Sequence, residues 1–164
     1  MYRKTLAAFA TAAVMALPTA LLAQTAPTVK DIKVEVDMAA VQNAEAAKYW
    51  GNLSNDLQSA ILANLVGQIA DDGANITVDI SEVELANGFA TAIGLGNTVL
   101  KGTVNQTHES NNGRFNAYEL TVDMNQTLPA LGEGFDINAA DVDTAKVYSA
   151  MVETFAKHVA ANVK

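Results

Sequence analysis

The sequence has no cysteine, and this absence excludes several kinds of chemistry. Disulfides cannot stabilise the fold, no cysteine can act as a nucleophile, and no lipid can be attached through a cysteine that follows an export signal. An exported domain without disulfides depends instead on a large hydrophobic core. Hydrophobic residues make up 50% of the chain, which is sufficient for such a core.

Histidine is almost as scarce, because the chain has only His108 and His158. His108 follows a predicted strand beside Glu109, and His158 lies late in the last predicted helix, where a positive charge is favourable. They are far apart in sequence, and no Gly-x-Ser-x-Gly motif accompanies them. The sequence therefore predicts neither a catalytic triad nor a zinc site, and it favours a protein that is not an enzyme. A hydrolase whose site the sequence does not reveal stays as an alternative.

Basic residues are few: 10 lysines and arginines stand against 18 aspartates and glutamates. Without Arg3 and Lys4, which belong to the export signal described next, eight basic residues face the same 18 acidic ones, a net charge of −10. A surface this negative repels phosphate backbones and anionic lipid headgroups. The charge argues against nucleic acid as a partner and permits cationic ligands, metals or a basic protein surface. Solubility alone also explains it.

The first 23 residues predict a cleaved secretory signal. Arg3 and Lys4 form a positive start, Leu6 to Leu22 carries no charge, and Ala23 is a small residue at the exit. Cleavage after Ala23 leaves Gln24 as the new N-terminus, with Ala26 as the second candidate site. An uncleaved anchor is the alternative, but the run is short and rich in alanine. We therefore expect a periplasmic protein of Gram-negative type with no stable membrane anchor after cleavage.

Hydrophobic periodicity divides the remainder into a flexible leader, residues 24–30, and a single domain, residues 31–164. Apolar residues alternate in four predicted strands and recur every three or four residues in two predicted helices. The expected elements are a strand at Ile32–Met38, a helix from about 39 to Ile69, a strand at Ile76–Ile80 with a bulge near Ser81–Glu82, a strand at Val99–Thr107, a return strand at Tyr118–Met124, and a last helix that Asp141 or Asp143 caps. The predicted fold class is α+β, in the order β-α-β-β-β-α, with a four-stranded, mainly antiparallel sheet and two helices on one face.

Local signals supplement this pattern. Residues 41–49 could form a separate short helix, and Gly73 stands where a left-handed helix cap is expected. Asn112-Gly113 between two β-rich runs predicts a hairpin. The apolar stripes predict a set of side chains that are buried together: Leu57, Ile61, Leu65, Tyr118, Leu120, Val122, Met151 and Phe155.

A group of oxygen-bearing side chains precedes the last helix: Asp136, Asn138, Asp141 and Asp143. A calcium loop of EF-hand type needs glycine at its sixth position and glutamate at its twelfth, and these positions hold Asp141 and Val147. Helix capping explains the aspartates better. The sequence therefore predicts no metal site and no cofactor.

Trp50 is the single tryptophan and begins the spacing Trp-x-x-Leu-x-x-x-Leu with Leu53 and Leu57. An alternating strand, Asn75–Val83, follows. This arrangement resembles the small auxiliary domains of outer-membrane assembly and lipid-transport systems in Gram-negative bacteria, although the lipid-bearing cysteine of those proteins is missing. The resemblance implies a non-catalytic role in which Trp50 contacts a partner. The alternative is that Trp50 belongs to the core.

The segment at 86–98 carries no charge and contains Phe89 and Ile93. A long uncharged connection of this kind is typical of a binding element, so Phe89 and Ile93 are predicted to contact a partner or ligand. The alternative is that they extend the core. The sequence thus favours a soluble interaction module of the cell envelope that binds an envelope protein, with a carrier of a small apolar ligand as the alternative.

Overall fold

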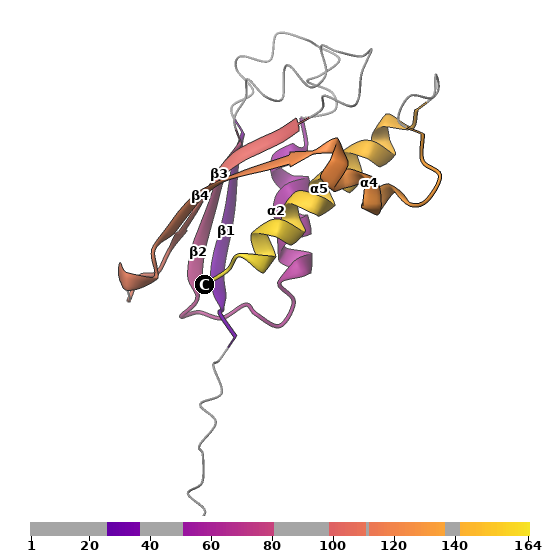
Figure 1. Cartoon of the computed structure of the whole chain (residues 1–164). Helices are drawn as coiled ribbons and strands as arrows, with labels where there is room; N and C mark the ends of the chain where they lie inside the picture. Colours follow the sequence, from indigo (N-terminus) through magenta and orange to yellow (C-terminus); the bar gives the residue numbers. More distant parts are fainter. Residues whose placement is uncertain (1–25, 37–50, 81–98, 111, 137–141) are drawn as a thin grey trace, which may run out of the picture.

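The computed structural model describes residues 26–36, 51–80, 99–110, 112–136 and 142–164. They form an α+β fold in which helices lie on one face of a four-stranded sheet (Figure 1). The strands lie in the order β1-β2-β3-β4. The elements are β1 (Val29–Val36), α2 (Leu53–Asn64), β2 (Ala74–Ile80), β3 (Val99–Thr107), a 3₁₀ turn (Asn112–Arg114), β4 (Asn116–Asp123), α4 (Met124–Leu131) and α5 (Thr144–Ala161).

The sheet is mixed, which corrects the expectation of a mainly antiparallel one. β2 and β3 are antiparallel, as are β3 and β4, but β1 and β2 are parallel, with Val34 beside Val78. Parallel neighbours need a crossover connection, and α2 lies between these two strands in the chain. β1 also begins at Val29, two residues before the expected start of the domain.

The face of the sheet toward the helices is apolar and the other face is polar. Alternation places buried side chains on the inner face of every strand: Ile32, Val34, Ile76, Val78, Ile80, Leu100, Val104 and Val122. On the outer face, Lys33 pairs with Glu35, and Lys101 Nζ lies 2.9 Å from Glu119 Oε2. The hydrophobic periodicity of the sequence therefore placed the core on the correct face.

Most of the predicted core is confirmed. Leu57, Ile61 and Leu65 are fully buried together with Phe155, and Val122 and Met151 join the same cluster. Tyr118 and Leu120 only pack against its margin and are half-buried. Both belong to β4, an outer strand that the helices cover incompletely.

Helix α2 ends earlier than the periodicity indicates, at Asn64 rather than Ile69. The chain reverses at Gly67, whose positive φ of 83° is accessible to glycine, so Ile69 leaves the buried stripe and is half exposed. Gly73 is not a left-handed cap. A Cβ atom at Gly73 would lie 2.4 Å from the carbonyl carbon of Val29, so the glycine permits a close approach of two chain segments.

The described part contains three helices instead of the two expected. The third, α4, begins directly after β4, where the sequence predicted that the strand continues to Met124. A reciprocal capping box starts it: Asp123 Oδ1 accepts from Gln126 N–H at 3.0 Å, and Gln126 Oε1 accepts from Asp123 N–H at 2.9 Å. Because of this capping box, a helix begins at Met124, although Met124 continues the alternating apolar pattern of β4.

Other local predictions are confirmed. Asp143 caps α5, because its Oδ1 accepts a 3.0 Å hydrogen bond from Lys146 N–H. β3 and β4 form the predicted antiparallel hairpin around the 3₁₀ turn. The separate helix at 41–49 and the bulge at Ser81–Glu82 lie outside the described residues. No helix in the described ranges is both long enough and apolar enough to cross a membrane.

Candidate functional site

The three residues that the sequence selected as a partner or ligand surface, Trp50, Phe89 and Ile93, lie outside the described residues. The two leucines that follow Trp50 in its motif, Leu53 and Leu57, are fully buried in the core. Two other surface features of the described part can bind a ligand or a partner. One is a groove between α4 and α5, and the other is an apolar patch at the end of α2.

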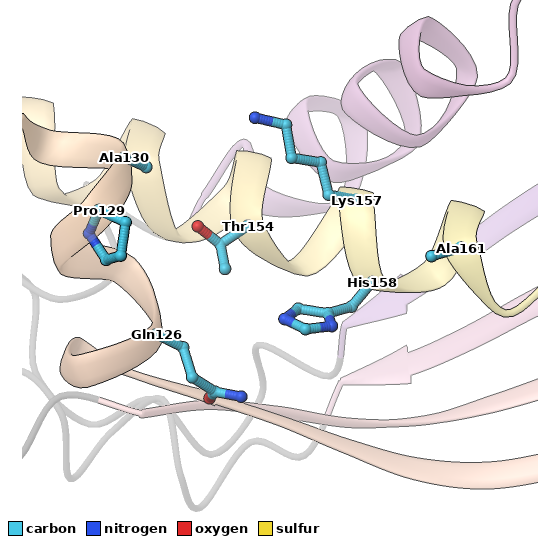
Figure 2. A pocket seen from close by; sticks show the side chains of 7 residues that line it. All are labelled: Gln126, Pro129, Ala130, Thr154, Lys157, His158 and Ala161. Carbon is cyan, nitrogen blue, oxygen red and sulfur yellow. The ribbon is translucent and has the colours of Figure 1, made fainter.

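The α4–α5 groove is open to solvent and has a volume of about 430 Å³ (Figure 2). This volume is in the range of small-molecule sites. Three residues come from α4 and four from α5. The lining consists of Gln126, Pro129, Ala130, Thr154, Lys157, His158 and Ala161.

The capping box of α4 determines which end of the Gln126 amide is available. Its oxygen, Oε1, accepts the hydrogen bond from Asp123 N–H, so the amide nitrogen is turned toward the groove (Figure 2). The imidazole of His158 reaches toward it from α5. The hydroxyl of Thr154 is already committed, since it donates to the Ala150 carbonyl at 2.7 Å. The polar groups that face each other across the groove are therefore an amide donor and an imidazole.

Lys157 contributes a positive charge at the rim rather than at the centre of the groove. Its ammonium points away from Gln126 (Figure 2), and it lies 3.3 Å from Glu153 Oε1. Among the residues that the structure describes, no carboxylate lines the groove, although the chain has 18 aspartates and glutamates. The groove is thus neutral to basic in a strongly acidic protein.

The second feature is a group of three exposed apolar side chains close together in the sequence, Leu62, Val66 and Ile69, here called the α2-end patch. Four large hydrophobic residues are exposed in the described part, and Phe115 at the hairpin tip is the only one outside this patch. Val66 is 81% exposed. The patch lies where α2 ends and the chain returns to the sheet (Figure 1). Such a concentration of exposed apolar side chains is typical of a contact surface.

The backbone beneath the patch is held to the sheet. Ala70 N–H donates to the Val29 carbonyl at 2.9 Å, and Val29 N–H donates to the Gln68 carbonyl at 2.7 Å. Asp71 and Asp72 follow immediately and are exposed. The patch is therefore presented on an anchored segment with an acidic border.

A polar contact between the two long helices, α2 and α5, does not form a site. The hydroxyl of Tyr148 on α5 donates to Asp56 Oδ2 on α2 at 2.7 Å. Burial, followed by the hydrogen bond to the Asp56 carboxylate, raises the pKa of Tyr148 well above its usual range. A phenol that stays protonated can hold α2 to α5 at neutral pH but cannot serve as a base.

Within the described ranges, no three His, Asp or Glu side chains are grouped so that they could hold a metal ion. Of the four residues considered for calcium, Asp143 caps α5, Asp136 is exposed, and Asn138 and Asp141 lie outside the described residues.

The sequence analysis missed both surfaces, although signals for them were present. Asp123-x-x-Gln126 is a capping-box spacing and could have revealed the start of α4. Leu62 and Val66 lie beside the stripe of Leu57, Ile61 and Leu65, and apolar residues off such a stripe are candidates for exposure.

No protein-family model matches the sequence, and no curated protein matches it either.

Proposed function

We propose that this chain is a non-catalytic interaction module of the cell envelope that acts in the periplasm after removal of its signal peptide. The observation that carries the proposal is the α2-end patch, which exposes Leu62, Val66 and Ile69 to solvent. Apolar side chains exposed in one place cost free energy that a partner can recover by covering them, about 25 cal/mol per Å². The patch has no evident role in the stability of the domain itself.

The interior of the described domain supports binding at the surface rather than inside. The space between sheet and helices is filled by side chains such as Ile61, Ile76 and Phe155, each with at most 1% of its surface exposed. A carrier needs a cavity between the sheet and the helices to hold its ligand. A surface contact needs only a firm platform, which the packed core and the backbone hydrogen bonds to Val29 provide.

The charge around the patch defines the chemistry of the partner. Asp71 and Asp72 border it, and the whole chain has a net charge of −8. A protein surface with an apolar centre and a rim of lysine or arginine complements both features. This partner would be an envelope protein.

Site-specific photo-crosslinking in living cells tests the proposal. A photoreactive residue at position 66 should give a discrete crosslinked protein, and the same residue at Thr103, on the polar face of the sheet, should not. Ile69→Ser should abolish the product at position 66, because it removes apolar contact area. Phe115→Ser removes another exposed apolar side chain, at the hairpin tip, and should leave the product unchanged. Crosslinking of equal strength at positions 66 and 103, or at neither, would contradict the proposal.

Export has its own test. The intact mass of the protein recovered from the periplasmic fraction should correspond to a chain that begins at or near Gln24. A recovered chain that retains Arg3 and Lys4 would contradict the cleaved signal and support an anchor instead.

A further inference from the structure

We infer that the α4–α5 groove is a binding site for a small carboxylate with a short apolar body. This property is separate from the contact at the α2-end patch. The groove lies between different helices and uses none of the patch residues. Failure of one proposal therefore leaves the other standing.

The hydrogen-bonding groups of the groove have defined directions. Gln126 is held by two hydrogen bonds to Asp123 that use its own backbone N–H and its side-chain oxygen. Its amide nitrogen is therefore the atom left for a ligand, and it can only donate. His158 faces it from the opposite helix (Figure 2). A donor amide and an imidazole on opposite walls suit a ligand group that accepts hydrogen bonds at two oxygens, as a carboxylate does.

The charge of the groove lining differs from that of the chain as a whole. Among the described residues, the lining includes His158 and Lys157, the latter paired with Glu153, but no acidic residue, in a chain where acidic residues outnumber basic ones by 18 to 10. An acidic ligand would be repelled by most of the protein surface but not by the groove lining. A carboxylate carries one negative charge, whereas a phosphate dianion carries two and is repelled more strongly by the net charge of the protein. The electrostatics therefore favour the carboxylate.

Part of the groove lining is apolar. Pro129 and Ala130 on α4, with Ala161 on α5, surround the polar groups with small hydrophobic surfaces. They leave room for a methyl or short methylene body and cannot hydrogen-bond through their side chains. A volume of about 430 Å³ accommodates an acyl amino acid or the last residues of a peptide.

The binding test uses N-acetyl-L-alanine as the probe and its neutral amide as the matched control. The imidazole signals of His158 and His108 are followed by NMR at constant pH, and His108, which follows β3, serves as the internal reference because it does not line the groove. We expect a saturable shift of the His158 signals with a dissociation constant on the order of millimolar and no shift of His108. The amide should give no saturable shift. A response of His158 to the amide equal to that for the acid would overturn the proposal, as would no response to the acid.

Gln126→Glu is the sharpest variant. Glutamate can accept the Asp123 N–H hydrogen bond and keep the capping box, but it presents a carboxylate to the groove instead of a donor. Binding of N-acetyl-L-alanine should weaken by about tenfold or more, the effect of losing one hydrogen bond to a charged group. His158→Asn should give a loss of similar size, and His108→Asn should give none. If either groove variant is unfolded by circular dichroism, the other decides; unchanged binding in a folded groove variant would overturn the proposal.

Two further probes identify the source of the carboxylate. A tripeptide with an acetylated N-terminus and a free C-terminus that binds more tightly than N-acetyl-L-alanine would assign the site to peptide C-termini, and equal or weaker binding would assign it to small free acids. Both outcomes support a carboxylate site. Inorganic phosphate that binds as tightly as the carboxylate would overturn the selectivity, because the groove would then respond to any anion.

Discussion

The two outer strands of the sheet differ in how completely they are covered. β1 lies under α2, and Val29, Ile32 and Val34 on its inner face are buried. β4 has only Val122 buried, whereas Tyr118 and Leu120 are half exposed. In Figure 1 the hairpin of β3 and β4 extends beyond the helices at its tip. The difference indicates that the stability of the domain is concentrated on the side of β1 and α2.

The backbone edges of these strands differ in the same way. The start of β1 is paired with the segment Gln68–Ala70, and farther along the strand Ser54 Oγ on α2 donates to the Val34 carbonyl at 2.6 Å. Within the described residues, β4 pairs only with β3. An outer strand with unpaired backbone groups is open to association, so β1 is protected where β4 is not. The first three of the following predictions test this asymmetry, and the fourth tests the contact between α2 and α5.

The largest effect is expected from a cavity on the α2 side. Leu57→Ala removes a fully buried side chain and should lower the free energy of unfolding by about 2–5 kcal/mol. Leu120→Ala on β4, the matched control, removes a half-exposed leucine and should cost about 1 kcal/mol. Urea denaturation measures both. Equal losses would show that the two sides of the sheet contribute alike.

The next effect concerns the buried side-chain amide of Gln106, on the strand that pairs with β4. Gln106 on β3 is fully buried; its Nε2 donates to the Asn162 carbonyl at 2.9 Å, and its Oε1 accepts from Lys164 N–H at 3.3 Å. Gln106→Met keeps the length of the side chain but leaves the Asn162 carbonyl without this donor, so we expect a loss of about 1–3 kcal/mol. Gln58→Met, at a half-buried position on α2, is the control. A loss no greater than that of the control would show that the C-terminal residues are not held by this amide.

A smaller effect is expected at the edge of β1. Ser54→Ala removes the hydrogen bond to the Val34 carbonyl and should cost about 1 kcal/mol. Ser59→Ala, on an exposed position of the same helix, makes the same chemical change without this contact. The difference in unfolding free energy between the two variants measures the edge bond. No difference would show that the edge of β1 is not stabilised by Ser54.

The smallest effect concerns Tyr148 and appears only at alkaline pH. The pKa of Tyr148 is raised in the folded protein by burial and by the bond to Asp56, from an ordinary value of 10.0. Above pH 10 the unfolded chain can release this proton and the folded chain cannot, so stability is complete below that pH and falls as the pH rises further. Tyr148→Phe should show a shallower fall of the melting temperature between pH 9.5 and about 11. The same fall in wild type and variant would refute this assignment.

Local sequence signals predicted much of the fold, because they describe interactions between near neighbours in the chain. Alternation located β1, β2 and β3, and the apolar stripe together with Asp143 located α5. The hairpin followed from Asn112-Gly113. None of these depends on what lies opposite in space.

The remaining features depend on contacts between distant parts of the chain. Whether β1 and β2 are parallel depends on how α2 packs, and the segment after α2 is bound to β1 through hydrogen bonds between Val29 and the backbone of Gln68 and Ala70. The helix α4 was obscured because Met124 continues the alternation of β4. Periodicity states that a residue is apolar but not whether a neighbour covers it.

Both proposed surfaces belong to this second class. Composition, charge and periodicity established a cysteine-free, acidic α+β chain and most of the residues that the structure buries in its core. Only the tertiary structure exposed Leu62, Val66 and Ile69 and brought Gln126 of α4 opposite His158 of α5. Exposure and juxtaposition depend on where whole helices end and pack, and those positions result from long-range contacts that a single sequence does not display.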